Sequence, residues 1–457
     1  MKSHSVGLLL AAAATAGCFD DAKLRAPADD IGMVDVPMNP VDVLDARVDT
    51  SLPDVTHDAG LDADVSDVAS DSADVSDATD ASDASDVPAT GCTLSRVLVA
   101  TSDYLNGGYA IGSLSPTPSL TPSSVMSPDQ DHLAVQSGCV VYNLLRSSDV
   151  LAVLDPMNLP TIARRIPLRM GSDSGAQYQV NPYDVYTYLP EKAYVVQYAV
   201  PRIAVVNPTR DGADAVIRSI DLSPVRAAED RDTSGSLEAS AIVRAGRYLF
   251  VVLQNLNSYM PVTNGTLAVI DPTGDVLVDT DTTSAPIDPV RLTGRNPAAI
   301  DVTRGGRLVV AESGVVAFTA PQMLDGAIEW IDPATFRSSG TLVTEAQLGG
   351  DIKALVMLDE SRAWVVVTQL ASGAAGMPSA RVVEVNLDAA DGSRIGRTIV
   401  STGDIGGLAR DPSGNVWVLD RTTGHAGVRV FNSMGMEVTT SPLSSGTYPP
   451  AGIAFVP

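Results

Sequence analysis

One short pattern recurs along residues 94–457 and limits what this 457-residue chain can fold into more than any other feature. It is an apolar run that ends in Asp or Asn, often followed by Pro. An Asp or Asn side chain caps a turn, and Pro fixes φ and stops a strand, so each copy predicts a β-strand ending in a tight turn. The copies are LAVLDP ending at Pro156, IAVVNP at Pro208, LAVIDP at Pro272 and IEWIDP at Pro333, with weaker ones ending at Leu114, Leu387 and Ser433.

A second apolar run precedes each copy, and we expect it to be the second strand of a repeating unit. These runs are RVLVATS (96–102), HLAVQS (132–137), AYVVQY (193–198), YLFVVLQN (248–255), RLVVAES (307–313), AWVVVTQ (363–369) and VWVLDR (416–421). Runs such as YDVYTYL before them and IARRIPL after the motif supply a first and a fourth strand. Seven four-stranded units, with motifs about 42 to 64 residues apart, predict an all-β fold, a seven-bladed β-propeller over residues 91–457.

The two ends of this region predict how the ring closes. RVLVATS reads as a second strand with no first strand before it, whereas the segment 450–457 reads as a first strand with no second strand after it. Pairing the two completes one blade and leaves no open sheet edge. We therefore expect the C-terminal strand to close the propeller, with Ile453 and Phe455 on the innermost strand of the first blade.

The repeat also carries a resemblance. A strand, a turn and a strand followed by the "aVIDP" ending resemble the repeat of YVTN-type, surface-layer-like propellers, and the resemblance covers residues 94–457. It implies a fold and a binding or scaffolding role, and it implies no particular activity.

The N-terminus predicts export. Lys2 is followed by an apolar run from Val6 to Ala14, which is too short to span a bilayer, and then by small residues, as in a secretory signal peptide (1–17). The segment Thr15–Cys18 resembles a bacterial lipobox, although Thr15 stands where that family usually has Leu. The resemblance implies a lipid on Cys18, and Phe19 after it favours the outer membrane. The alternative is an ordinary signal peptide with a chance cysteine.

Residues 18–90 predict a disordered tether. Between Phe19 and Thr90 there are 19 Asp, no Glu and three basic residues, and from Asp71 to Asp86 every third residue is Asp. Such a segment cannot bury enough apolar surface to offset its chain entropy. Calcium binding by the Asp array is the alternative, but known loops place Asp at alternate positions with a Gly. The net charge of −25 excludes a nucleic-acid partner.

Catalytic motifs are absent from the sequence, so we assign no catalytic residue. Oxygen-bearing side chains do recur where the first strands begin: Asn181, Glu238, Asn296, Asp351 and Asp404. In a propeller these positions surround one mouth of the central channel. Gluconolactonase-type propellers resemble this set, which implies a Ca²⁺ site on Glu238, Asn296, Asp351 and Asp404, whereas ordinary turn chemistry accounts for the same residues without a cofactor.

Two cysteines remain besides Cys18. An exported protein favours a disulfide between Cys92 and Cys139. Against it, the predicted strands place Cys92 before a second strand and Cys139 after one, near opposite faces. Both outcomes stay open. His132 and His425 are expected to face solvent, and a cluster of six Tyr between 178 and 198 suits either strand packing or contact with a glycan or peptide.

The sequence thus predicts a monomeric lipoprotein, held to a membrane by its lipid on the periplasmic or cell-surface side of the outer membrane. Its propeller is expected to bind or scaffold an unknown protein or glycan without catalysis. The alternative function is a metal-dependent lactonase- or lyase-like enzyme with its site at the channel mouth.

Overall fold

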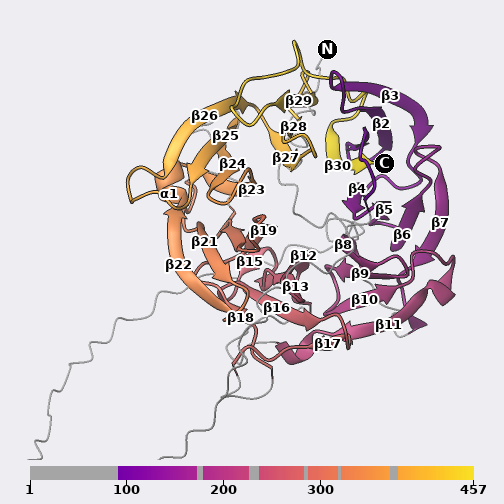
Figure 1. Cartoon of the computed structure of the whole chain (residues 1–457), viewed down its shortest axis with the longest axis horizontal. Coiled ribbons are helices and arrows are strands. Elements are labelled where there is room, and N and C mark those ends of the chain that lie inside the picture. The colour runs from indigo at the N-terminus through magenta and orange to yellow at the C-terminus, as the bar shows by residue number, and fades with distance from the viewer. Residues whose placement is uncertain (1–90, 172–178, 226–235, 282–286, 317–320, 371–378) are drawn as a thin grey trace, which may run out of the picture. The chain divides into compact units, whose positions relative to one another are not determined.

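The computed structural model describes residues 91–171, 179–225, 236–281, 287–316, 321–370 and 379–457. These residues form seven antiparallel blades around a common axis, together with one separate two-stranded sheet (Figure 1). The predicted seven-bladed propeller is confirmed. The predicted signal peptide (1–17), the lipidation site Cys18 and the tether (18–90) lie outside the described residues, as does Tyr178. In the part of the chain that is described, no helix is long and apolar enough to cross a membrane.

One strand of each blade lies innermost, next to the propeller axis (Figure 1). In blade order these strands are β30 (Pro450–Val456), β4 (His132–Ser137), β8 (Pro182–Leu189), β12 (Ala239–Ala245), β19 (Pro297–Val302), β23 (Asp351–Met357) and β27 (Ile405–Arg410). We call the end of the axis where these strands begin the start end. The end where they turn into the second strands is the turn end.

The second and third strands follow in antiparallel order. The second strands are β1 (Arg96–Ser102), β5 (Val140–Leu145), β9 (Lys192–Gln197), β13 (Tyr248–Leu253), β20 (Leu308–Glu312), β24 (Arg362–Gln369) and β28 (Val416–Asp420). The third strands are β2 (Gly107–Ser113), β6 (Val150–Leu154), β10 (Arg202–Val206), β16 (Thr266–Asp271), β21 (Ala327–Asp332), β25 (Ser379–Asn386) and β29 (Gly427–Phe431).

The outermost strands vary most in length from blade to blade. They are β3 (Ser119–Met126), β7 (Ile162–Pro167), β11 (Val216–Asp221), β22 (Arg337–Thr344), β26 (Ile395–Thr402) and, in blade 4, the two short pieces β17 (Val276–Leu277) and β18 (Val290–Arg291). Blade 7 has three named strands, and isolated bridges to Glu437 and Leu443 border β29. Between β13 and β16 there is a short hairpin of β14 (Leu256–Asn257) and β15 (Met260–Pro261). The one-turn helix α1 (Glu345–Leu348) lies between β22 and β23.

The ring closes as predicted. β30 pairs with β1 in antiparallel register, with Ile453 opposite Val99 and Phe455 opposite Val97 (Figure 1). The side chain of Phe455 packs on Trp417 of blade 7. The C-terminal strand thereby completes the first blade and joins it to the last.

Blade 2 differs from the sequence prediction. HLAVQS is the innermost strand β4 and not a second strand. A tight turn at Gly138 (φ 60°) and Cys139 leads from it into β5, the true second strand, which the sequence prediction did not include. All four strands of this blade lie between His132 and Pro167. This correction moves Cys139 to the turn end.

The Asp or Asn that ends most third strands acts as the sequence predicted. Its side-chain oxygen accepts a hydrogen bond from the backbone N–H two residues later, which fixes the following turn. The donor–acceptor pairs are Met157–Asp155, Thr209–Asn207, Thr273–Asp271, Ala334–Asp332, Asp388–Asn386 and Met434–Asn432, at 2.9 to 3.2 Å.

The hydrophobic core lies between neighbouring blades. Tyr194 and Val205 of blade 3 pack with Leu249 and Val251 of blade 4, and Trp364 of blade 6 packs with Phe431 of blade 7. Burying one such side chain stabilises a fold by roughly 1.5–3 kcal/mol. The blades therefore stabilise one another, and none has a core of its own.

Six of the seven innermost strands contain a β-bulge near their start. The ladder to the second strand skips one residue in each: Tyr183, Ser240, Ala298, Lys353, Gly406 and Ala451. A bulge bends a strand and turns its extra side chain in a new direction. Only β4 pairs without a skipped residue. The bulges bring the side chains of Tyr183 and Lys353 to neighbouring blades.

Candidate functional site

The five oxygen-bearing side chains predicted from the sequence do lie at the start end, and all five are buried. Asn181, Glu238 and Asn296 share a left-handed backbone conformation, with φ of 52°, 45° and 50°. In these three and in Asp404, the backbone carbonyl accepts the N–H of the residue that follows the second strand. The shared feature is therefore a backbone link that fixes the start of the innermost strand.

Three of these side chains turn back to the protein. Asn181 Oδ1 accepts a hydrogen bond from Arg146 Nε at 2.9 Å, and Asn296 Nδ2 donates to the Gly314 carbonyl at 3.0 Å. Glu238 Oε2 accepts the Leu256 N–H at 2.8 Å, and its other oxygen accepts the Ser236 hydroxyl. Their polar atoms support loops of their own or the preceding blade.

The two aspartates of the predicted metal set have different surroundings. Asp404 pairs with Lys353 Nζ at 3.1 Å and with Arg421 Nε at 3.7 Å, so two side-chain cations already neutralise its charge. Asp351 begins β23 and pairs across the ladder with Thr368. Among the described residues, no group of three or more His, Cys, Asp or Glu side chains is arranged to hold a metal ion.

A closed belt of inter-blade contacts surrounds the axis at the start end. Each blade contributes a polar side chain, mostly from just after its second strand, that reaches the next blade. We call this set the inter-blade belt. Its contacts are Ser102 Oγ to Gln130 O, Arg146 Nε to Asn181 Oδ1, Tyr198 OH to Gln254 Oε1, Gln254 Nε2 to Pro297 O, Ser313 Oγ to Ile352 O, Lys353 Nζ to Asp404 Oδ1 and Arg421 Nη1 to Pro450 O.

Three buried glutamates lie in and next to blade 5, and the sequence analysis did not identify them. Burial, and then the hydrogen bond and charge of Glu329, raise the pKa of Glu312 to about 10. Burial raises the pKa of Glu345 to about 8, although it accepts the N–H groups of Gly326 and Ile352. A glutamate inside the apolar run IEWID was the available signal for Glu329.

The histidines differ from one another. His132 was expected to face solvent, but it is fully buried, and its ring nitrogens lie 3.0 Å from Asn143 Oδ1 and 3.1 Å from the Thr101 carbonyl. Burial lowers its pKa below the ordinary value. It links blade 2 to blade 1. His425 lies in an exposed loop.

The described tyrosines of the 178–198 cluster pack within the fold. Tyr183 stacks on Tyr198 with ring centroids 4.8 Å apart, and the Arg146 guanidinium lies 4.5 Å from the Tyr183 ring. Tyr188 contacts the buried Tyr194 edge to face. These contacts use the rings for packing between strands and blades.

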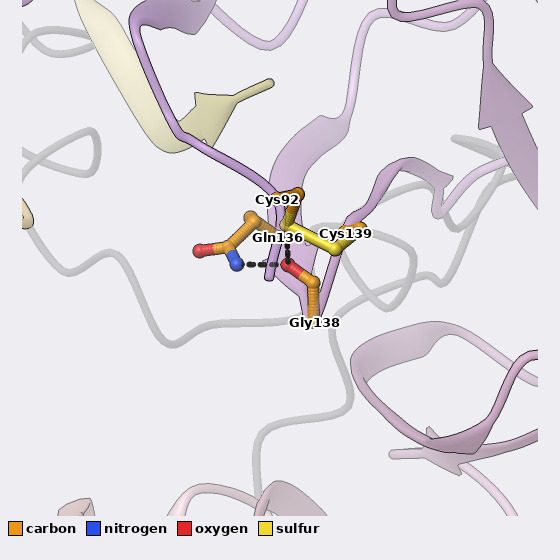
Figure 2. Close-up of a disulfide and its surroundings, with 4 residues drawn as sticks. All are labelled: Cys92, Gln136, Gly138 and Cys139. Atoms are coloured by element: carbon orange, nitrogen blue, oxygen red, sulfur yellow. Dashed lines mark hydrogen bonds between the residues drawn. A yellow bond between two sulfur atoms is a disulfide. The ribbon is translucent and has the colours of Figure 1, made fainter. Parts of the chain in front are cut away.

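Cys92 and Cys139 form a disulfide at the turn end, with Cα atoms 5.8 Å apart (Figure 2). The sequence placed them near opposite faces because HLAVQS was assigned to the wrong strand. Figure 2 shows the bridge beside Gln136, whose amide donates to the Gly138 carbonyl. The disulfide therefore fastens the beginning of the propeller to the β4–β5 turn.

A cavity of about 930 Å³ opens at the turn end, where the sequence analysis placed no site. The turns that follow β19, β23 and β27 line it, together with Leu94, Gln136 and Phe455. Val302, Met357 and Leu358 make part of its wall apolar. At the start end, the pocket beside His132 and Arg146 measures only about 30 Å³.

Four carboxylates line the cavity, and each has a protein partner. Asp301 accepts the N–H groups of Val302 and Met357 at 2.7 and 2.8 Å. The other three contacts are Asp359 Oδ2 with Arg362 Nε at 2.7 Å, Glu360 Oε1 with Gly305 N at 2.8 Å, and Asp411 Oδ2 with Trp417 Nε1 at 3.0 Å. Burial raises the pKa of Asp301, and these N–H groups and the charge of Arg410 oppose that rise.

Comparison with known proteins supports the fold. No family model matches the chain, and no curated protein matches its sequence. A putative 6-phosphogluconolactonase from Bacteroides uniformis is similar in structure, with a TM-score of 0.53, 14% identity, and coverage of 79% of this chain and 99% of that one. The periplasmic gluconolactonase of Pseudomonas aeruginosa gives a TM-score of 0.49 at 14% identity, covering 80% and 99%.

At such low identity, similarity shows the propeller fold and nothing about ligand or chemistry. The YVTN-type family and the lipoprotein class stay predictions from the sequence. The described residues establish a seven-bladed propeller that is closed by its C-terminal strand. The inter-blade belt surrounds the axis at its start end, and a cavity opens at its turn end.

Proposed function

We propose that this chain is an exported lipoprotein whose propeller binds a ligand at the turn end and catalyses no reaction. The signal peptide and Cys18 support export and lipid anchoring to the outer membrane, on its periplasmic or cell-surface side. The cavity of about 930 Å³ is the observation that supports binding at the turn end. Its size falls within the range of small-molecule sites, roughly 300–1,000 Å³.

The distribution of polar groups between the two ends supports the same proposal. At the start end, the inter-blade belt engages polar side chains around the whole axis. A hydrogen bond between blades stabilises the fold, and a ligand that takes its donor or acceptor must offset the loss of that bond. These contacts support ligand binding at the turn end, where the larger cavity lies.

The metal-dependent, lactonase- or lyase-like alternative depends on Glu238, Asn296, Asp351 and Asp404. A hard cation prefers six to eight oxygen ligands in one shell. In this set, Glu238 and Asn296 bind loop backbone and Asp404 pairs with Lys353. Nothing in these contacts favours the alternative, and it enters the test below as the contradicting outcome.

Fractionation of cells tests the anchor. Replacing Cys18 with Ser should move the full-length protein from the membrane pellet to the soluble fraction, because buried acyl chains contribute about 0.8 kcal/mol per CH₂. Cys92→Ser is the matched control, since it removes a different cysteine and should leave the protein in the pellet. A Cys18→Ser protein that stays in the pellet after a high-salt wash contradicts the lipoprotein proposal.

Photo-crosslinking in the native envelope tests the binding end. A photoreactive residue replaces Pro412 at the cavity in one variant and Leu105, which is 74% exposed at the start end, in the other. We expect adducts, detected by mass spectrometry, from position 412 and few from position 105. The reverse pattern, or calcium-dependent lactone hydrolysis by the purified protein, overturns the proposal.

A further inference from the structure

Two arginines distinguish the lining of the turn-end cavity. Arg304 lies in the turn after β19, and Arg410 is the last residue of β27, so they approach the cavity from blades 5 and 7. Both are exposed. Within the described part of the chain, neither guanidinium makes a hydrogen bond or an ion pair with another residue.

The position of Arg410 is supported by its effect on a neighbour. Asp301 belongs to the innermost strand of blade 5, two blades before the one that carries Arg410. Burial raises the pKa of that carboxyl, and the charge of Arg410 nevertheless opposes this rise. Arg410 and Asp301 both line the turn-end cavity.

The charged groups of the lining are four carboxylates and the two arginines, and they differ in their protein partners. Its four carboxylates already accept hydrogen bonds from backbone N–H groups, from Trp417 or from Arg362. Among the described residues, no acceptor occupies the guanidinium groups of Arg304 and Arg410, so these two groups are left for an anionic ligand.

We infer that the turn-end cavity binds a small organic oxyanion, with its carboxylate or phosphate held between Arg304 and Arg410. This inference rests on the proposed function and names the chemical class of the ligand. A guanidinium presents parallel N–H groups that match a carboxylate or phosphate in a two-point contact. The apolar part of the wall, including Met357 and Phe455, suits the carbon body of the same molecule.

Calorimetric titration of the purified full-length protein tests the inference. The probes are D-glucuronate, which presents a carboxylate on a sugar, glucose 6-phosphate, which presents a phosphate on a sugar, glucose, and inorganic phosphate. We expect saturable binding of one or both sugar anions and none of glucose. Comparison of the two anions identifies the preferred oxyanion, and inorganic phosphate reports what the arginines bind without a carbon body.

Variants test the residues. A hydrogen bond to a charged group contributes about 1.5–3 kcal/mol, so Arg304→Gln or Arg410→Gln should weaken binding about tenfold or more. Arg304→Lys should retain only part of the binding affinity, because Lys keeps the positive charge but cannot make the two-point contact of a guanidinium. Arg337→Gln is the matched control: this arginine of β22 is exposed and lies outside the cavity lining, so binding should be unchanged.

The outcomes separate this inference from the proposed function. No binding of any anion, or equal loss in all three glutamine variants, overturns the inference. If crosslinks from position 412 persist in that case, binding at the turn end stands without the oxyanion. Equal binding of inorganic phosphate and the sugar anions would indicate an adventitious ion only and would also overturn it.

Discussion

The two ends of the propeller axis differ in how they use their polar side chains. At the start end, belt residues such as Arg146, Gln254 and Lys353 are buried or nearly so, and each contacts the next blade. At the turn end, Arg304 and Arg410 are exposed beside a cavity of about 930 Å³. Polar residues at the mouth of a propeller are therefore no sign of a site by themselves. Their engagement with neighbouring blades decides whether they hold the ring or meet a ligand.

The disulfide adds to this difference. It joins Cys92 to Cys139 at the turn end, where the rim between blades 1 and 2 is fastened covalently (Figure 2). At the start end, the same two blades are joined by Ser102 and by the buried His132. Blades 1 and 2 are thus joined by a disulfide at the turn end and by hydrogen bonds at the start end.

Loss of ring closure should have the largest effect on both ends. Deleting residues 450–457 removes β30, which pairs with β1 and carries the Pro450 carbonyl of the inter-blade belt. The β1 edge and the apolar surfaces of blades 1, 2 and 7 would become exposed, which favours aggregation. We expect the shortened protein to lose its cooperative thermal transition or to melt far below the parent.

Deletion of residues 26–87 is the control for that truncation, since it removes many more residues but none of the propeller. The melting temperature should stay within about a degree of the parent's, because the sequence predicts that this segment is a tether outside the propeller. A C-terminal truncation that melts like this control would show that β30 is not required for the ring.

The next prediction separates the ends. Lys353→Met removes a nearly buried cation from the belt and leaves Asp404, among the described residues, with the Arg421 guanidinium at 3.7 Å as its remaining cation. Removing one partner of a buried ion pair destabilises a protein, and with Arg421 remaining we expect a cost of about 2 kcal/mol in the free energy of unfolding. Arg304→Gln at the turn end should change it by less than about 0.5 kcal/mol. Urea unfolding measures both, and equal costs would contradict the distinction between the ends.

The fold was largely readable from the sequence because its signals are local. The Asp or Asn at the end of the third strands caps its own turn, and each apolar run lies within one strand, so neither needs knowledge of distant residues. The strand error at HLAVQS arose where a two-residue turn at Gly138 and Cys139 joins β4 to β5, as two-residue turns also join the first two strands of blades 3 and 4. That single shift also placed Cys92 and Cys139 near opposite faces, which left their disulfide an open question.

The candidate site was much less readable. The sequence shows that Asn181 and Asp404 carry oxygen atoms at equivalent positions, but not that Arg146 and Lys353 from neighbouring blades meet them. It gives no sign that the turns carrying Arg304 and Arg410, about a hundred residues apart, line one cavity. Contacts between blades depend on the closed ring, and a local pattern does not encode them.

The last prediction concerns pH and the buried acids of the start end. Glu312 has an unperturbed pKa of 4.5 and a folded-state pKa of about 10, and Glu345 has a folded-state pKa of about 8. The folded protein therefore holds protons that the unfolded chain releases above pH 4.5. Stability from these groups is fully present below that pH and is lost as the pH rises toward 8 and then 10.

We accordingly expect the urea midpoint to fall between pH 5.5 and pH 8.5. Glu312→Gln should reduce this fall, since an amide keeps a donor for the Glu329 carboxylate and has no proton to lose. Glu360→Gln is the control, because Glu360 is exposed at the turn end and its variant should retain the parent's pH dependence. A Glu312→Gln protein with the same pH dependence as the parent would show that the buried pair does not hold the proton. The two ends would then still differ in their contacts between blades, but the start end would not owe its pH dependence to a protonated Glu312.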